Sequence, residues 1–120
     1  MSADHRYAAR RDVTTMIPVV DALTGVVVGR VGNLCATGIQ VVRGSAASAE
    51  SLQQGALYQW TFALPAEIGG GQVECGVEVM WNGHDAGRGG DLVGARFILI
   101  DPATMERIAH WCAAAKPVTA

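Results

Sequence analysis

In the stretch VECGVEVMW, residues 73–81, apolar residues recur at every second position. This period is typical of a strand that buries one face and exposes the other. Glu74 and Glu78 lie on the exposed face. The predicted buried face consists of Val73, Cys75, Val77, Val79 and Trp81. The stretch therefore predicts a half-buried strand within a β-rich domain.

Further strand-forming segments lie on both sides of this stretch. β-branched residues are concentrated before and after a predicted turn at Thr24-Gly25. A later segment places Tyr58, Trp60 and Phe62 on one face and ends at Pro65. The predicted strands are 13–20, 26–34, 39–42, 56–64, 73–81 and 92–100. About six strands in one chain predict an all-β domain.

The intervening segments predict two loops and one helix. Gly44–Gly55 is rich in Ser, Ala and Gln and predicts a surface loop, whereas the Gly-rich Asn82–Gly90 predicts a mobile hairpin loop. Asp101-Pro102 supplies an N-cap and then Pro at the first helical position. The apolar stripe that would dock this C-terminal helix on the sheet consists of Met105, Ile108, Ala109 and Cys112.

The composition is that of a single globular domain. The chain has 120 residues, half of them apolar and 17% charged, with a net charge of −2. This charge excludes a generally basic nucleic-acid binder. There is no run of about 18 apolar residues to span a membrane and the start of the chain is polar, so we expect a cytoplasmic protein. Three widely spaced cysteines predict buried free thiols.

Three arginines lie close together near the start of the chain: Arg6, Arg10 and Arg11. They belong to a segment without periodicity, which predicts a flexible arm over residues 1–12. Each guanidinium can grip a phosphate, or the O6/N7 edge of guanine, with two parallel hydrogen bonds. The alternative is a solubilising tail, because charged and exposed termini are common. The arginines alone leave both interpretations open.

The segment Asn33-Leu34-Cys35-Ala36-Thr37-Gly38 predicts a strand end that turns sharply and returns to the sheet at Ile39. In an ordinary turn, Asn33 would bond its own backbone and Gly38 would supply a positive φ. In a binding site, Asn33 would present its carbonyl and amide to a guanine edge, and Gly38 would keep the backbone close to the base. These residues alone leave both interpretations open.

Taken in order, Arg6-x-x-x-Arg10 and Asn33-x-Cys35-x-x-Gly38 resemble the signature of the PilZ domain family, Arg-x-x-x-Arg followed by Asp/Asn-x-Ser-x-x-Gly. The likeness runs nearly end to end, and it extends through 17–20, 29–31, 77–81, 94–97 and a terminal helix. It implies a six-stranded antiparallel β-barrel with a C-terminal α-helix. It also implies a bacterial effector that binds cyclic di-GMP.

The resemblance assigns ligand binding to the arm and the turn. Arg6 and Arg10 would hold the phosphates and the guanine Hoogsteen edges, with Arg11 as a further candidate outside the strict motif. Asn33 and Gly38 would shape the guanine pocket. The full set of candidate ligand-binding residues is Arg6, Arg10, Arg11, Asn33, Cys35 and Gly38.

Cys35 is the position that departs from the family pattern, which has Ser there. A thiol is a poorer hydrogen-bond donor and acceptor than a hydroxyl. We therefore expect the loss of one ordinary hydrogen bond, worth about 0.5–1.5 kcal/mol or up to about tenfold in affinity. This loss would weaken nucleotide binding without abolishing it.

Two functions follow from the resemblance. The first is a cyclic di-GMP receptor that passes the signal to a separate, unidentified effector protein, in control of motility, biofilm formation or virulence. The alternative is an interaction adaptor that has kept the PilZ barrel and binds nucleotide weakly or not at all. The expected organisation is a flexible arm over 1–12, the barrel with its helix over 13–116, and a tail over 117–120.

No enzyme, metal or cofactor is predicted. His84 and Asp85 lie in a Gly-rich segment, but no nucleophile with an identifiable base accompanies them. His110 and Cys112 are two positions apart on the predicted helix and therefore point to different faces. The expected partners are cyclic di-GMP and an effector protein, with no nucleic acid.

Overall fold

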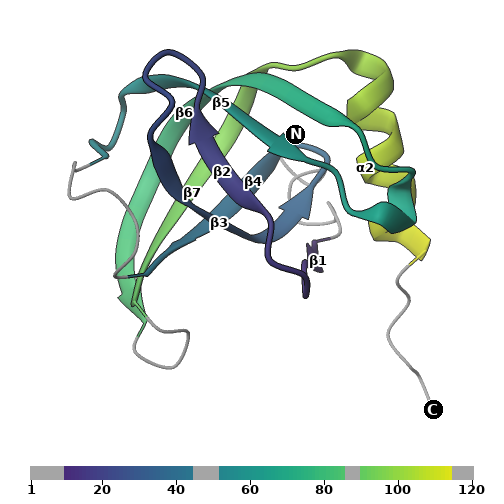
Figure 1. Cartoon of the computed structure of the whole chain (residues 1–120), viewed down its shortest axis with the longest axis horizontal. Helices are drawn as coiled ribbons and strands as arrows, with labels where there is room; N and C mark the ends of the chain where they lie inside the picture. The colour runs from purple at the N-terminus through teal and green to yellow at the C-terminus, as the bar shows by residue number, and fades with distance from the viewer. Residues whose placement is uncertain (1–9, 45–51, 86–89, 115–120) are drawn as a thin grey trace, which may run out of the picture.

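The computed structural model describes residues 10–44, 52–85 and 90–114. The strand predicted at 73–81 is confirmed as part of β6 (Gln72–Asp85), which lies antiparallel between β5 (Leu57–Ala63) and β7 (Gly90–Leu99) (Figure 1). The other elements are β1 (Arg11–Asp12), β2 (Pro18–Asp21), β3 (Val27–Cys35), β4 (Gly38–Arg43), η1 (Ala66–Ile68) and α2 (Pro102–Ala114).

The strands close into a barrel. Their order is β3-β2-β5-β6-β7-β4, every pair is antiparallel, and β4 pairs back with β3. The predicted six-stranded antiparallel barrel with a C-terminal helix is therefore confirmed. The two-residue β1 is an additional strand, which pairs with the end of β3. One edge of β3 thus pairs with β2 and, further along, with β1. The other edge pairs with β4.

Inward-facing side chains from every barrel strand and from α2 fill the core. The largest fully buried ones are Trp60, Phe62, Leu34, Ile39, Ile108, Val19, Val31, Val41, Val77, Val79 and Val93. The predicted burial of Trp81 is wrong, since its side chain is 43% exposed. A register shift between Val79 and Trp81 breaks the alternation there. The indole lies over Gly94, where a Cβ atom would collide with it.

The single strand predicted over 13–20 is wrong, because the chain forms β1 before this segment and β2 at its end. Val13 and Ile17 each keep one backbone hydrogen bond to β3, at 2.9 Å. Residues 14–16 lie between them, outside the sheet and exposed. The reason is that the two chain segments differ in length. Asp12 and Pro18 are six residues apart, but their partners on β3, Asn33 and Arg30, are only three residues apart, so the extra residues cannot stay paired.

The prediction that all of 82–90 is a loop is also wrong, because both ends of this segment belong to strands. β6 continues to Asp85 and β7 begins at Gly90, with His84 paired opposite Asp91. Polar residues are compatible with these strand ends because the antiparallel ladder satisfies backbone groups whatever the side chains are. Residues 86–89 lie outside the described part of the chain.

The loop predicted over 44–55 lies mostly outside the described residues, which resume at Leu52. The Leu52 side chain is buried in the core. Its carbonyl oxygen accepts a hydrogen bond from the Asn82 side-chain amide at 2.6 Å. The end of this segment is therefore held against β6.

The helix α2 begins where the sequence predicts. The Thr104 amide donates to Asp101 Oδ2 at 3.2 Å, which makes Asp101 the cap. The docked face differs from the predicted stripe: Met105 is 37% exposed, and the buried residues of the helix include Trp111. Among the described residues, no helix is long and apolar enough to span a membrane.

Candidate functional site

The candidate turn is a tight hairpin between β3 and β4. Cys35 pairs with Gly38, so only Ala36 and Thr37 connect the two strands. Gly38 does not have the positive φ of the ordinary-turn interpretation, because it is not among the described glycines with positive φ. The residue is required for space: a Cβ atom there would collide with the carbonyl oxygen of Ala95 on β7. Gly38 therefore lets β4 lie close to β7 at the base of the turn.

Asn33 is the single buried polar residue of the described chain, with 7% of its surface exposed. Its Oδ1 accepts a hydrogen bond from Arg10 Nη1 at 2.7 Å. Its Nδ2 donates to Gln40 Oε1 at 2.8 Å. Asn33 therefore joins the arm to the facing strand, because Gln40 is its direct partner in the β3–β4 register.

Arg11 is anchored to the C-terminal half of α2. Its guanidinium carbon lies 4.3 Å from the ring centroid of Trp111, and its Nη1 donates to the Trp111 carbonyl oxygen at 3.0 Å. The first contact is a cation–π interaction, and the second places positive charge at the negative end of the helix dipole. The two neighbouring arginines thus hold different elements: Arg10 contacts the hairpin and Arg11 contacts the helix.

Cys35 faces into the protein instead of toward solvent. Its side chain is buried, and its Sγ lies 3.2 Å from Thr37 Oγ1 in the hairpin loop. The nearby Cys112 donates from Sγ to the Leu34 carbonyl oxygen at 3.2 Å. Burial, and then the proximity of Cys35, raise the pKa of Cys112, while Arg11 opposes the rise. The Cys35 thiol is therefore part of the packing beneath the turn.

The structure brings together most of the candidate residues. Arg10 and Asn33 are hydrogen-bonded to each other. Cys35, two residues after Asn33, pairs with Gly38 across the hairpin. Arg11 pairs with Leu34 at the edge of β3. Arg6 lies outside the described residues. The sequence interpretation missed Gln40 and Trp111, which hold Asn33 and Arg11 respectively.

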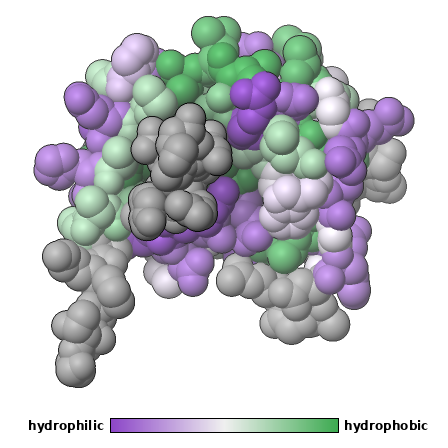
Figure 2. Space-filling model, turned by 180° about the vertical axis from the view of Figure 1, so that it is seen from behind, coloured by the Kyte–Doolittle hydropathy of each residue, from purple (hydrophilic) through white to green (hydrophobic). Residues whose placement is uncertain are grey.

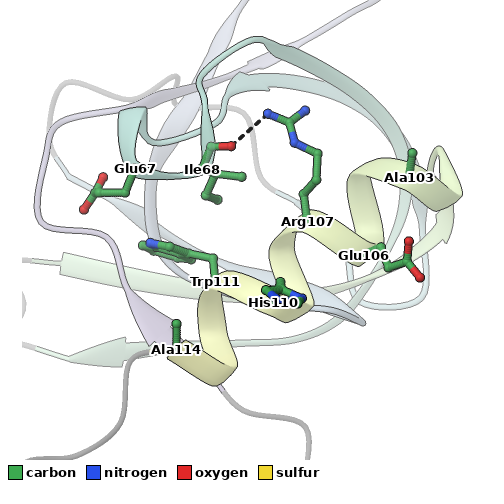
Figure 3. Close-up of a pocket in the computed structure, with 8 residues that line it drawn as sticks. All are labelled: Glu67, Ile68, Ala103, Glu106, Arg107, His110, Trp111 and Ala114. Carbon is green, nitrogen blue, oxygen red and sulfur yellow. Dashed lines mark hydrogen bonds between the residues drawn. The ribbon is translucent and has the colours of Figure 1, made fainter.

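A separate open groove of about 800 Å³ lies between η1 and α2 (Figure 3). Its lining residues are Glu67, Ile68, Ala103, Glu106, Arg107, His110, Trp111 and Ala114. Arg107 reaches across it and donates from Nη2 to the carbonyl oxygens of Ile68 and Gly70, at 3.0 and 3.2 Å. Arg107 thus holds η1 against α2.

The remaining reactive side chains of the described chain include a buried thiol and an exposed His–Asp contact. Burial, with a further contribution from Glu74, raises the pKa of the Cys75 thiol to about 12, which keeps it protonated at neutral pH. His84 Nδ1 lies 3.0 Å from Asp91 Oδ1 as an exposed pair. Within the described ranges, no cluster of three His, Cys, Asp or Glu residues is suited to a metal ion.

Comparison with known proteins identifies the fold. No protein-family model matches the sequence, and no curated protein matches it. Among solved structures, the Bacillus subtilis inhibitor of motility MotI/DgrA superposes with a TM-score of 0.74 at 19% identity, over 91% of this chain and 50% of that one. The chain thus spans about half the length of that protein.

The second solved structure is the PilZ domain of YcgR from Escherichia coli, in a structure with c-di-GMP. It superposes with a TM-score of 0.66 at 14% identity, over 91% of this chain and 89% of that one. The chain therefore has the PilZ fold, a six-stranded barrel with an extra N-terminal strand and a C-terminal helix. The predicted resemblance in fold is confirmed.

Proposed function

We propose that this chain is a receptor for cyclic di-GMP. The observation that carries the proposal is the 2.7 Å hydrogen bond between Arg10 and Asn33. It joins the two parts of the sequence motif, which are 23 residues apart along the chain. The solved PilZ domain of YcgR with c-di-GMP supports the choice of ligand. The ligand would lie against the outer face of the β3–β4 hairpin.

The proposed contacts follow from the chemistry of the side chains. Arg6 and Arg10 would bind the phosphates and the Hoogsteen edges of the guanines through paired hydrogen bonds, with Arg11 beside them. Asn33 would meet a guanine edge, and Gly38 would keep the turn compact. Cys35 would support the turn from within.

Binding would exchange internal contacts for contacts with the ligand. Arg10 donates to Asn33 and Arg11 to Trp111 in the described structure, so ligand phosphates must compete with these partners. An arginine drawn from Trp111 would alter the surface of α2. We propose that a separate effector protein in the cytoplasm recognises this altered surface.

Calorimetric titration with cyclic di-GMP tests the proposal. We expect saturable heat at ligand concentrations of about 100 μM or below, where even a micromolar site fills. Absence of heat at that concentration would rule out the receptor function.

Replacing Arg10 tests the role of the arm. We expect Arg10→Ala to weaken binding by about 1.5–3 kcal/mol, the value of a charge-assisted hydrogen bond. The matched control is Arg107→Ala, which removes an arginine that bonds the carbonyl oxygens of Ile68 and Gly70, away from the β3–β4 hairpin, and should leave affinity unchanged. Equal affinities of the wild type and Arg10→Ala would remove Arg10 from the site.

A second function is favoured by the same contacts. Arg10 and Arg11 already have partners within the protein, and Cys35 replaces the serine of the family signature. These features suit an interaction adaptor with the PilZ fold that binds nucleotide weakly or not at all. The calorimetric titration separates the two functions, because an adaptor of this kind gives no saturable heat.

A further inference from the structure

Exposed apolar side chains gather where β7 ends, beside the start of α2 (Figure 1). They border an open hollow of about 570 Å³, whose lining also includes the two residues of the β3–β4 hairpin loop. Single exposed apolar residues are ordinary on a protein surface, whereas a cluster around one hollow typically marks a site of protein contact. We call this cluster the β7 patch; its exposed apolar residues are Met80, Ile98, Leu99 and Met105.

Leu99 projects from the β7 patch. Its side chain is 69% exposed, although the residue lines the hollow. The residue opposite it on β6 is Gly76, which has no side chain to cover it. The patch therefore offers both a projecting leucine and a recess beside it.

The charges at the β7 patch cancel. Arg96 is the charged side chain among the described residues that line the hollow. Its Nε donates to Glu78 Oε1 at 2.8 Å, and its Nη2 lies 2.7 Å from the same oxygen. Beyond this ion pair the surface is apolar again, since Glu78 pairs on its other side with the exposed Leu57. The patch thus has no net charge to attract a strongly acidic or basic partner.

Shape and charge both fit a second copy of the same chain. In a two-fold symmetric contact the same surface lies on both sides, so each group must find its counterpart within that surface. The projecting Leu99 of each copy would enter the recess of the other. Because both signs of charge are present, Arg96 of each copy would face Glu78 of the other.

We infer that the β7 patch is a self-association surface, through which two copies of the chain form a symmetric dimer. The inference does not depend on the receptor function. The contact would nevertheless reach the hairpin of the candidate site, because the Phe97 amide in the patch donates to the Thr37 carbonyl oxygen at 2.9 Å.

Sedimentation equilibrium of the full chain tests the inference. We expect the mass of a dimer at a protein concentration of about 100 μM, where a contact with a micromolar dissociation constant is almost fully formed. A monomer mass at this concentration would overturn the inference, whatever the titration with cyclic di-GMP shows. Saturable heat in that titration would then leave the receptor function standing.

Leu99→Arg places a charge in the centre of the contact on both copies. We expect it to weaken dimerisation by at least about tenfold, as changes at central interface side chains commonly do. The matched control is Leu23→Arg, since Leu23 is also exposed but lies in the turn between β2 and β3, outside the patch. Equal dimerisation of Leu99→Arg and the wild type would place the contact elsewhere and overturn the inference.

Charge reversal tests the symmetry of the contact. Arg96→Glu leaves two acidic side chains at the ion pair and Glu78→Arg leaves two basic ones, so we expect each variant alone to dimerise more weakly than the wild type. A mixture of the two variants restores opposite signs across the contact. We expect dimers in the mixture at a concentration where each variant alone is a monomer. A mixture that associates no better than its components would contradict the pairing of Arg96 with Glu78 between copies.

Discussion

At the scale of single residues, the site depends on space as much as on polar groups. Gly38 lies where any side chain would meet the carbonyl oxygen of Ala95 on β7. The requirement is steric, because the backbone of Gly38 has no positive φ. A glycine of the candidate motif is therefore needed for the contact between β4 and β7.

We expect Gly38→Ala to lower the free energy of unfolding by about 1–3 kcal/mol, the usual cost of forcing an extra methyl group into packed structure. Urea denaturation followed by circular dichroism measures the change. Gly83→Ala is the control, since Gly83 is also in a strand, has no positive φ, and has no atom within 4 Å of the added Cβ. Equal stabilities for the two variants would contradict the steric explanation.

Cys35 leads to a second prediction at this scale. A serine hydroxyl at this position forms a stronger hydrogen bond with Thr37 Oγ1 than the thiol does, and the turn geometry is retained. We expect Cys35→Ser to bind cyclic di-GMP equally well or up to about tenfold more tightly, within the range of one neutral hydrogen bond. A clear loss of affinity by calorimetry would show that the turn is built around the thiol.

At the scale of elements, the contact between β1 and α2 links the two ends of the described chain. Arg11 contributes both a cation–π interaction and a hydrogen bond to Trp111. The rest of β1 is a two-residue pairing with β3. The helix therefore provides much of what holds β1 in place.

A double-mutant cycle measures this link. We expect Arg11→Ala and Trp111→Phe to have a coupling energy of about 0.5–1 kcal/mol in urea denaturation, because Trp is a stronger cation–π partner than Phe. Arg96→Ala combined with Trp111→Phe is the control cycle, because Arg96 lies on β7 and bonds Glu78 on β6. A coupling energy near zero for Arg11 and Trp111 would mean that the stacking does not stabilise the fold.

The elements also show how far sequence patterns lead. The alternation at 73–81 and the Asp101 cap predicted β6 and the start of α2, because both signals are local. The division of 13–20 between β1 and β2 was missed, since it depends on the register against β3. Gln40 was missed for the same reason: its role follows from lying opposite Asn33, and no spacing along the chain reveals that pairing.

At the scale of the whole molecule, the closed sheet makes one core common to all barrel strands. Side chains from β2 to β7 and from α2 belong to a single buried cluster. Apolar side chains remain outside it: the end of β7, at the top of Figure 1 beside the start of α2, exposes Ile98 and Leu99. In Figure 2, which shows the molecule from behind, hydrophobic residues, coloured green, also gather along the upper edge.

A single core predicts cooperative unfolding. We expect the urea transitions followed by far-ultraviolet circular dichroism and by tryptophan fluorescence to coincide, because Trp60 reports the barrel interior and Trp111 reports the docked helix. Separate midpoints would show that α2 detaches before the barrel unfolds.

The short strand β1 has one more consequence. Because β2 reaches only as far as Arg30 along β3, the N–H and C=O groups of β3 near Asn33 and Leu34 would form an open sheet edge without β1. Open edges readily accept strands from other chains. A chain shortened to begin at Val13 would therefore expose a template for strand addition, and a ligand that draws the arm away would create the same template only when it is bound.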